Sequence, residues 1–222
     1  MRLFVDTANL AEINQAVDRG ITGITTNPTL VAREQQSPRV LLNMIVNLAV
    51  QLGPDAHVSV EAVGTSYDEL RTDAIRLRDD YARRVTVKLP ATWDGYRIIH
   101  HLGTSVSTNC TACMSYTQVA MGVNAGATFV SLFWNRIRDG GEDPASIVRA
   151  VRETFDRDGI PTEIIVGSIR QPSDVAEAFH AGAHIVTVPP PILRQLCEHP
   201  KTDEVVAQFT ADARGVLADG RR

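Results

Sequence analysis

The sequence lacks any apolar stretch of membrane-spanning length, and no hydrophobic signal core precedes the first apolar run, Leu3-Phe4-Val5. It contains only three cysteines, Cys110, Cys113 and Cys197. Their odd number and uneven spacing argue against a disulfide framework and for a reducing compartment. We therefore expect a soluble cytoplasmic protein that has no membrane partner.

The sequence also lacks an excess of basic charge, because 22 lysines and arginines face 26 acidic residues, the formal net charge is -4 and the isoelectric point is near 5.9. This balance excludes the broad basic surface of a general nucleic-acid binder and favours small anionic ligands. Cys110 and Cys113 form a C-x-x-C without a second ligand pair, so we interpret them as small buried hydrophobic residues. No histidine has ligand spacing with carboxylates, and we predict neither a metal site nor a cofactor.

Lysine is the rarest charged residue, with two copies, Lys88 and Lys201, against twenty arginines. Lys88 lies in the apolar run Val85-Thr86-Val87-Lys88-Leu89-Pro90. Burial disfavours the charged ammonium form, and a neutral amine attacks carbonyl carbons, which a permanently charged guanidinium cannot do. The alternative is that Lys88 stands at a strand end with its amine in water or paired with a carboxylate.

Short β-branched runs alternate with longer segments of helical period. The predicted strands are Leu3–Val5, Gly23–Thr25, His57–Val60, Val85–Val87, Ser105–Ser107, Thr128–Ser131, Glu163–Val166 and His184–Val188. The predicted helices are Leu10–Asp18, Pro38–Leu52, Ser66–Asp80, Gly95–His101, Thr117–Asn124, Pro144–Asp156 and Ser173–Ala181. Such alternation implies parallel pairing, and eight units close a (β/α)₈ barrel.

The length of 222 residues fits one such barrel as a single domain over residues 1–222. Small-residue turns at Ala125-Gly126-Ala127 and Ala181-Gly182-Ala183 mark its bottom face. The tail over residues 200–222 carries Val205, Val206, Phe209, Val216 and Leu217. It predicts an additional helix that packs on the barrel or on a neighbouring subunit, with a frayed end at Gly220-Arg221-Arg222.

Polar residues follow the predicted strands, at the face where barrels of this kind assemble their chemistry. They are Asp6, Asn27, Glu61, Lys88, Asn109, Thr111, Arg136, Ser168 and Arg170, joined by Phe133. A barrel with a purely structural interior needs few such groups at this face. We therefore expect these side chains to converge on one site.

The order of these motifs resembles the transaldolase and fructose-6-phosphate aldolase family, nearly from end to end. The motifs are Val5-Asp6-Thr7, Thr25-Thr26-Asn27-Pro28, Val58-Ser59-Val60-Glu61, Val87-Lys88-Leu89-Pro90, Thr108-Asn109-Cys110-Thr111, Ser131-Leu132-Phe133 with Arg136, and Gly167-Ser168-Ile169-Arg170. The resemblance implies that Lys88 forms a Schiff base with the C2 carbonyl of a ketose phosphate. Asp6 then matches the base for the C4 hydroxyl, and Glu61 with Thr111 matches the pair that holds a catalytic water.

The resemblance also assigns binding roles, each with an alternative. Thr25, Asn27, Asn109, Ser131 and Phe133 match residues at the substrate, although the asparagines are equally suited to satisfying loop backbone groups. Arg136, Ser168 and Arg170 match the phosphate site. Asp6 has the alternative of a helix cap, and Glu61 that of a buried salt bridge which quenches Lys88.

Glu61 and Phe133 separate the two activities of the family. Aldolases that release free dihydroxyacetone typically carry glutamine and tyrosine at these positions, so this chain resembles the transaldolases. Fructose 6-phosphate or sedoheptulose 7-phosphate is then the expected donor and an aldose phosphate the acceptor. The alternatives are an aldolase and a non-catalytic barrel that binds sugar phosphates. Family resemblance further implies a homo-oligomer.

Three residues depart from the family pattern near Phe133: Leu132, Trp134 and Asn135. A bulky indole at this place would reshape the acceptor pocket, unless strand alternation turns Trp134 outward into the helix layer. Cys110 and Cys113 flank Thr111 and are a second unusual feature of the expected lining.

Overall fold

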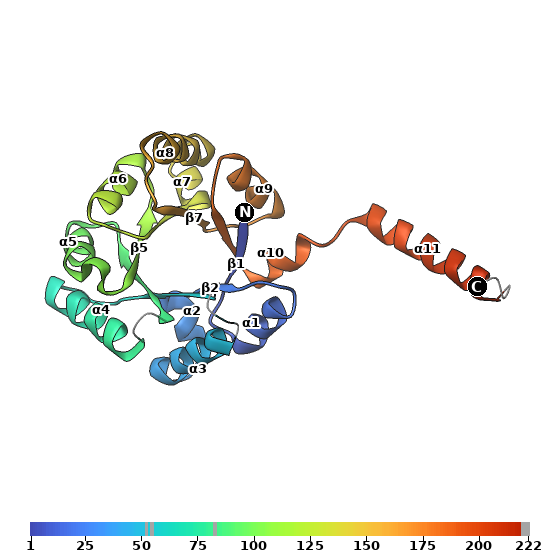
Figure 1. Ribbon diagram of the computed structural model, residues 1–222, viewed down its shortest axis with the longest axis horizontal. Coiled ribbons are helices and arrows are strands. Elements are labelled where there is room, and N and C mark those ends of the chain that lie inside the picture. The colour runs from blue at the N-terminus through green and yellow to red at the C-terminus, as the bar shows by residue number, and fades with distance from the viewer. Residues whose placement is uncertain (52, 54–55, 82–83, 219–222) are drawn as a thin grey trace.

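The computed structural model describes residues 1–51, 53, 56–81 and 84–218, and their side chains as far as Arg214. Within this part of the chain, eight parallel strands close a barrel in sequence order, and helices surround it (Figure 1). The strands are Arg2–Asp6 (β1), Gly23–Thr25 (β2), His57–Glu61 (β3), Thr86–Pro90 (β4), Ser107–Cys113 (β5), Phe129–Phe133 (β6), Glu163–Gly167 (β7) and Ile185–Val188 (β8). The predicted (β/α)₈ fold with an additional C-terminal helix is therefore confirmed.

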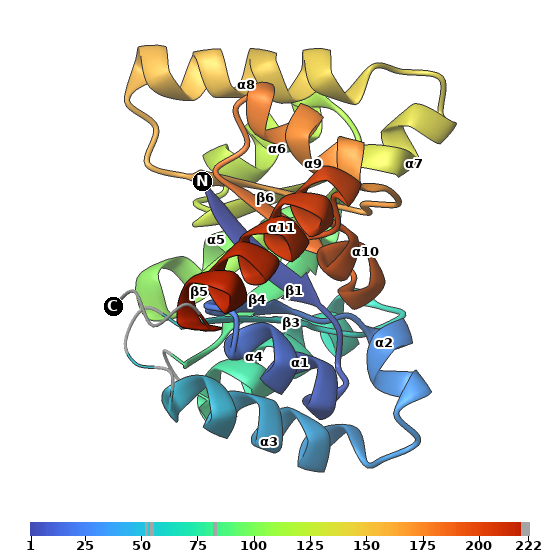
Figure 2. The same cartoon turned by 90° about the vertical axis from the view of Figure 1, so that its right-hand side faces the viewer.

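All but the last two helices lie between the strands in the chain and form the outer layer, and the last two follow β8 (Figures 1 and 2). The helices are Leu10–Val17 (α1), Pro28–Arg33 (α2), Pro38–Gln51 (α3), Tyr67–Tyr81 (α4), Trp93–Leu102 (α5), Tyr116–Asn124 (α6), Trp134–Asp139 (α7), Pro144–Asp158 (α8), Pro172–His180 (α9), Pro190–Gln195 (α10) and Pro200–Ala218 (α11). Gly126 and Gly182, in the predicted small-residue turns, have positive φ angles of 97° and 108°. Only glycine adopts this backbone without strain, which explains the tight return from α6 to β6 and from α9 to β8.

Side chains alternate along each strand between the helix layer and the barrel interior. In β1, Val5 belongs to the large cluster packed under the helices, whereas Phe4 belongs to a separate cluster with Phe129, Ile165 and Ile185. That second cluster fills the lower interior. Asp6, Ser131 and Thr187 follow two residues after members of that cluster and therefore face the same interior one layer higher. The period of two thus places polar groups above an apolar floor.

The structure corrects the sequence prediction at the fifth strand and at three short helices. The sequence predicts a strand at Ser105–Ser107, but Gly103–Ser105 is a 3-10 turn and β5 runs over Ser107–Cys113. This strand is rich in threonine and asparagine because its interior face lies in the polar layer, so hydrophobicity does not reveal it. The prediction also lacks α2, α7 and α10, which are six residues each and too short to show a helical period.

The tail forms the expected helix, but α11 extends away from the barrel (Figure 1). Every described side chain from Lys201 to Arg214 is exposed, including Phe209 at 65% of its surface. The alternative that this helix packs on its own barrel is therefore wrong. The side chains of Val216 and Leu217 and the segment Gly220-Arg221-Arg222 lie outside the described residues.

The barrel floor contains an ionisable group, His57, between two aromatic rings. Its ring stacks on Phe4 with centroids 4.9 Å apart and meets Phe129 edge-on at 4.8 Å, while its Nε2 contacts Ser59 Oγ at 2.7 Å. Burial, and to a smaller degree the charge of Arg2, lowers the pKa of His57 from 6.5 to about 4. The folded barrel therefore holds this imidazole in its neutral form at pH 7.

We predict that this histidine makes the barrel sensitive to acid. The unfolded chain binds a proton at His57 below about pH 6.5, whereas the folded chain resists it until about pH 4, so stability is lost as pH falls through that window. Between pH 7 and pH 5 this group should remove about 2 kcal/mol of unfolding free energy. Urea unfolding at both pH values checks this in the wild type and in His57→Gln. An equal pH dependence in the two proteins contradicts the prediction.

Candidate active site

A cavity of about 200 Å³ opens at the carboxyl-terminal end of the strands. Most of its lining comes from interior positions of the strands and the residues that directly follow them, and α7 adds an arginine. The lining residues are Asp6, Thr25, Asn27, Lys88, Thr111, Ser131, Phe133, Arg136, Gly167, Ser168 and Thr187. Nine of these are predicted from the sequence as site residues. Glu61, Asn109 and Arg170 are also predicted but do not line the cavity.

Lys88 is buried inside the barrel, with 7% of its side chain exposed. Its Nζ donates a hydrogen bond to the Thr26 carbonyl oxygen at 2.9 Å and lies 3.2 Å from Glu61 Oε2. Glu61 and Lys88 are register partners in β3 and β4, so both side chains emerge at the same height. Lys88 is the third residue of β4 and does not follow the strand, because β4 continues to Pro90. The expected amine is thus inside the cavity, and the carboxylate partner that the sequence left open is present.

Asp6 ends β1, three strands away from β4 in the closed barrel. The Thr25 hydroxyl donates to Asp6 Oδ1 at 2.7 Å and also contacts the Thr187 hydroxyl at 2.6 Å. Burial raises the pKa of Asp6, and the lysine charge and the Thr25 hydrogen bond only partly oppose it. Helix α1 is capped by Asn9, whose side chain accepts from two backbone N–H groups, and so Asp6 is free of that task.

Thr187 lines the cavity but is not among the site residues predicted from the sequence. A signal for it exists, because alternation along β8 from the interior residue Ile185 places Thr187 on the same face. The four-residue strand Ile185–Val188 is otherwise apolar, and a lone threonine in it is also a common strand former. Its hydroxyl extends the Asp6–Thr25 hydrogen-bonded pair to a third strand.

A second polar group lies on β5 and β6. Ser131 Oγ donates to Asn109 Oδ1 at 2.8 Å, deep in the barrel. Asn109 Nδ2 and Thr111 Oγ1 are buried, and neither has a hydrogen-bond partner among the described residues. Buried polar atoms are costly to leave unpaired and normally bind protein, water or ligand. Thr111 lines the cavity, so its hydroxyl is suited to hydrogen bonding with a bound molecule, whereas Asn109 lies behind the lining residue Ser131.

The part of the cavity that Arg136 and Ser168 line carries positive charge. Arg136, from the first turn of α7, and Ser168, directly after β7, both line it. Arg170 instead forms two contacts with Asp139, from NH1 to Oδ1 at 2.9 Å and from NH2 to Oδ2 at 2.5 Å. Of the three residues expected at the phosphate, the structure therefore places two on the cavity and pairs the third with a carboxylate.

Asn27 has both of the tasks that the sequence left open. Its side chain accepts a hydrogen bond from the Leu30 N–H at 3.1 Å and so begins α2 as the capping residue. The same residue also borders the cavity. The cap fixes the direction in which α2 leaves β2, and it holds the Asn27 side chain at the rim.

The departures from the family pattern lie behind this cavity. Trp134 is fully buried in the cluster under the helices, as are Leu132, Cys110 and Cys113. Of the two alternatives for the indole, reshaping the pocket or facing the helix layer, the structure has the second, because Trp134 is the first residue of α7. The two cysteines are buried as predicted, with sulfur atoms 3.8 Å apart.

The described residues contain neither a metal-binding cluster nor a membrane span. No group of three or more histidine, cysteine, aspartate or glutamate side chains in this part of the chain is placed to hold a metal ion. Likewise, none of the helices described here is both long and apolar enough to cross a membrane.

Known proteins resemble this chain in fold and, separately, in sequence. Two mandelate oxidase structures superpose with a TM-score of 0.58 at 15% and 16% identity, over 85% of this chain and 65% and 64% of theirs. This likeness concerns the barrel alone. The sequence match is far closer: the family model described as Transaldolase/Fructose-6-phosphate aldolase covers residues 3–220.

Curated relatives agree with that model. A probable transaldolase of Thermoplasma acidophilum is 39% identical over 100% of this chain and 99% of its own length. A probable transaldolase of Thermodesulfovibrio yellowstonii is 38% identical over 96% of this chain and 97% of its own length. With a match that includes every cavity-lining residue, the chain belongs to the transaldolase and fructose-6-phosphate aldolase family.

Proposed function

We propose that this protein is a Schiff-base transaldolase, which moves a dihydroxyacetone unit from a ketose phosphate to an aldose phosphate. Fructose 6-phosphate and sedoheptulose 7-phosphate are the proposed donors. The observation that carries the proposal is the Lys88 amine, which lines the cavity and contacts only a carbonyl oxygen and a carboxylate among the described residues. A primary amine in such a place is positioned to attack a ketone carbon.

Glu61 supplies the proton transfers that imine formation needs. Attack requires the neutral amine, and the carboxylate 3.2 Å from Nζ is the nearest acceptor for its proton. The amine nitrogen bonds to C2 as the C–O π bond breaks, and the proton that the nitrogen then loses passes to the oxygen, which gives a neutral carbinolamine. Its hydroxyl gains the proton that Glu61 took from the ammonium and leaves as water, with Thr111 Oγ1 available to hold it, and a protonated imine remains. The ion pair between Lys88 and Glu61 is thus the state before the reaction, and proton transfer within it gives the neutral amine that attacks.

Asp6 acts as the base in the cleavage of the C3–C4 bond. Its raised pKa suits a group that must accept a proton from the C4 hydroxyl and later return it. As the C4 hydroxyl loses its proton, the C3–C4 bond breaks, its electrons pass into the iminium, and an aldose phosphate departs. The Thr25 hydrogen bond fixes the orientation of the Asp6 carboxylate throughout.

Asn109 Nδ2 and Ser131 are proposed ligands of the substrate hydroxyls, and Arg136 with Ser168 bind the phosphate. Arg170 joins them only when it exchanges Asp139 for phosphate, since its guanidinium is occupied by that carboxylate. Both residues of this pair are about half exposed, so the exchange costs little.

Phe133 favours transfer over net cleavage. It lines the cavity without a hydroxyl group and cannot donate a proton to the enamine that stays on Lys88. The enamine therefore persists until an aldehyde arrives. The second candidate function is an aldolase that releases free dihydroxyacetone, because the matching family model includes both activities.

The proposal extends to quaternary structure and location. Val205, Val206 and Phe209 form an exposed apolar surface on α11, which extends away from its own barrel (Figures 1 and 2). Burying that surface against another copy supports a homo-oligomer. The three cysteines are free thiols, although two of them are neighbours, which supports a reducing cytoplasmic location.

Borohydride trapping tests the nucleophile. Incubation with fructose 6-phosphate and reduction should leave a three-carbon adduct on Lys88, detected by peptide mass spectrometry. Lys88→Met should abolish the adduct and reduce transfer by at least about a thousandfold, because the covalent route is removed. Lys201→Met is the matched control, since Lys201 is exposed on α11, and it should trap normally. An adduct-free wild type, or an active Lys88→Met protein, rules the proposal out.

The Glu61→Gln variant tests the proton shuttle. An amide keeps the size of the side chain but accepts no proton, so kcat should fall by about a hundredfold and imine trapping should slow in parallel. Glu69→Gln, which removes an exposed carboxylate on α4, should leave both rates unchanged. If Glu61→Gln turns over at the wild-type rate, Glu61 is only a structural partner of Lys88.

Turnover with donor alone, compared with turnover with donor plus a four-carbon aldose phosphate, distinguishes a transaldolase from an aldolase. A transaldolase should release about one equivalent of aldose phosphate per active site from donor alone and then stop. Steady turnover should require the acceptor. Phe133→Tyr should raise the release of free dihydroxyacetone by about tenfold or more, because a phenol offers the missing proton. Equal rates with and without acceptor in the wild type identify an aldolase instead.

A further inference from the structure

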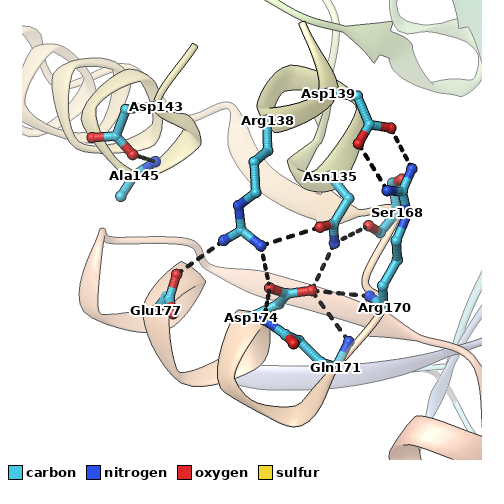
Figure 3. A network of polar contacts seen from close by, with 10 residues as sticks. All are labelled: Asn135, Arg138, Asp139, Asp143, Ala145, Ser168, Arg170, Gln171, Asp174 and Glu177. Carbon is cyan, nitrogen blue, oxygen red and sulfur yellow. Dashed lines mark hydrogen bonds and ion pairs between the residues drawn. The ribbon is translucent and has the colours of Figure 1, made fainter. Parts of the chain in front are cut away.

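A fully buried carboxylate, Asp174, lies next to the phosphate end of the cavity without lining it. It is the third residue of α9 and has 0% exposure. Its Oδ2 accepts from Asn135 Nδ2 at 2.6 Å and from the backbone N–H groups of Arg170 and Gln171 at 3.0 and 3.2 Å. Its Oδ1 accepts from Arg138 NH1 at 3.0 Å and from Gln171 Nε2 at 3.3 Å (Figure 3).

Asp174 remains charged in this place. Burial raises its pKa, but the hydrogen bonds from Asn135, the Arg170 N–H, Arg138 and Gln171 outweigh burial and lower the pKa below 3.8. A cap for α9 alone would need only the two backbone contacts. The contacts with Asn135 and Arg138 reach a different helix, α7, which indicates a task beyond capping.

Asn135 connects Asp174 to Ser168 by hydrogen bonds. Its Nδ2 donates both to Asp174 and to the Ser168 carbonyl oxygen, the latter at 2.8 Å, and its backbone N–H reaches the same carbonyl at 3.3 Å. Its Oδ1 accepts from Arg138 NH1 at 3.2 Å. Every polar group of the side chain is therefore engaged. Figure 3 shows these contacts joining α7 to the loop before α9.

Ser168 needs such support. Its φ angle of 60° lies in the left-handed region, which costs a residue other than glycine about 1 kcal/mol or more. The Ser168 carbonyl and the N–H groups two and three residues later are all held by Asn135 and Asp174. The strained turn that brings Ser168 to the cavity is thus fixed on both sides.

We propose that Asp174 is a positioning residue for phosphate binding, which sets Ser168 and Arg136 in register through Asn135 and Arg138. Arg136 lies one residue after Asn135, and Ser168 is the residue whose carbonyl Asn135 holds, so the network fixes the two phosphate-end residues relative to each other. The inference rests on the proposed function, in which this end of the cavity takes the phosphate of the sugar.

Donors with and without a phosphate test this role. Asp174→Ala should raise the KM for fructose 6-phosphate by about tenfold or more, with kcat/KM for unphosphorylated fructose within about twofold of the wild type. Asp174→Asn keeps an oxygen for the backbone N–H groups but presents a donor to Arg138, and it should raise the KM by about threefold. Glu177→Gln is the matched control. Glu177 contacts the same Arg138 at 3.2 Å and lies outside the Ser168 loop, so the variant should behave as wild type.

Titration of inorganic phosphate gives a readout that needs no turnover. The affinity should fall in Asp174→Ala in proportion to the KM change, and Asn135→Ala should weaken it similarly while the cap of α9 survives, which covers the case that Asp174→Ala does not fold. Equal losses on both donors, or unchanged phosphate affinity in either folded variant, overturn the proposal. Failure of Lys88 trapping in the wild type would instead refute the Schiff-base chemistry, and the phosphate titration would still decide the role of Asp174.

Discussion

The ion pair between Lys88 and Glu61 is the interaction on which the rest of the site depends. Two charges inside a barrel are costly to desolvate and remain there only with partners at hydrogen-bond distance. Register supplies the first partner, because Glu61 and Lys88 face each other across β3 and β4. The Thr26 carbonyl, from the loop after β2, supplies the second. Three neighbouring strands must therefore keep their relative heights for the amine to stay in place.

The same pair influences the Asp6 carboxylate at the end of β1. Asp6 is held in a buried position where its pKa is raised, and the positive charge of Lys88 opposes that rise. In the proposed mechanism, the transfer of a proton from Lys88 to Glu61 neutralises both groups. It removes the lowering effect of Lys88 on the pKa of Asp6 and the smaller raising effect of Glu61, so Asp6 becomes a stronger base. Proton movement at one carboxylate is thus coupled to the basicity of the other, because both carboxylates interact with one amine in a medium of low dielectric.

The alternation of side chains along strands explains how much of the fold and of the cavity lining the sequence predicts. Helix-facing aliphatic residues reveal every strand except the fifth, whose interior face carries Asn109 and Thr111, and polar residues at strand ends give most of the cavity lining. Thr187 is not predicted as a site residue because it is a single hydroxyl-bearing residue in an otherwise apolar strand. Arg170 and Trp134 depend on α7, a six-residue helix without a periodic signal. The long Arg170 side chain binds the anion that the tertiary structure brings near it, here Asp139. The spacing of residues along the chain does not show which anion that is.

The two ends of the cavity are also built differently. The part around Lys88 consists of strand residues whose positions the closed sheet fixes, whereas the proposed phosphate-binding part, at Arg136 and Ser168, belongs to one helix and one loop outside the sheet. Sheet hydrogen bonds cannot set the distance from Arg136 to Ser168. A separate set of contacts has to do so, and buried members hold a defined geometry best because water does not compete for their hydrogen bonds. The network around Asp174 supplies such contacts from two buried side chains, Asp174 and Asn135, and from the partly exposed Arg138; in the proposed function it aligns the phosphate of the substrate.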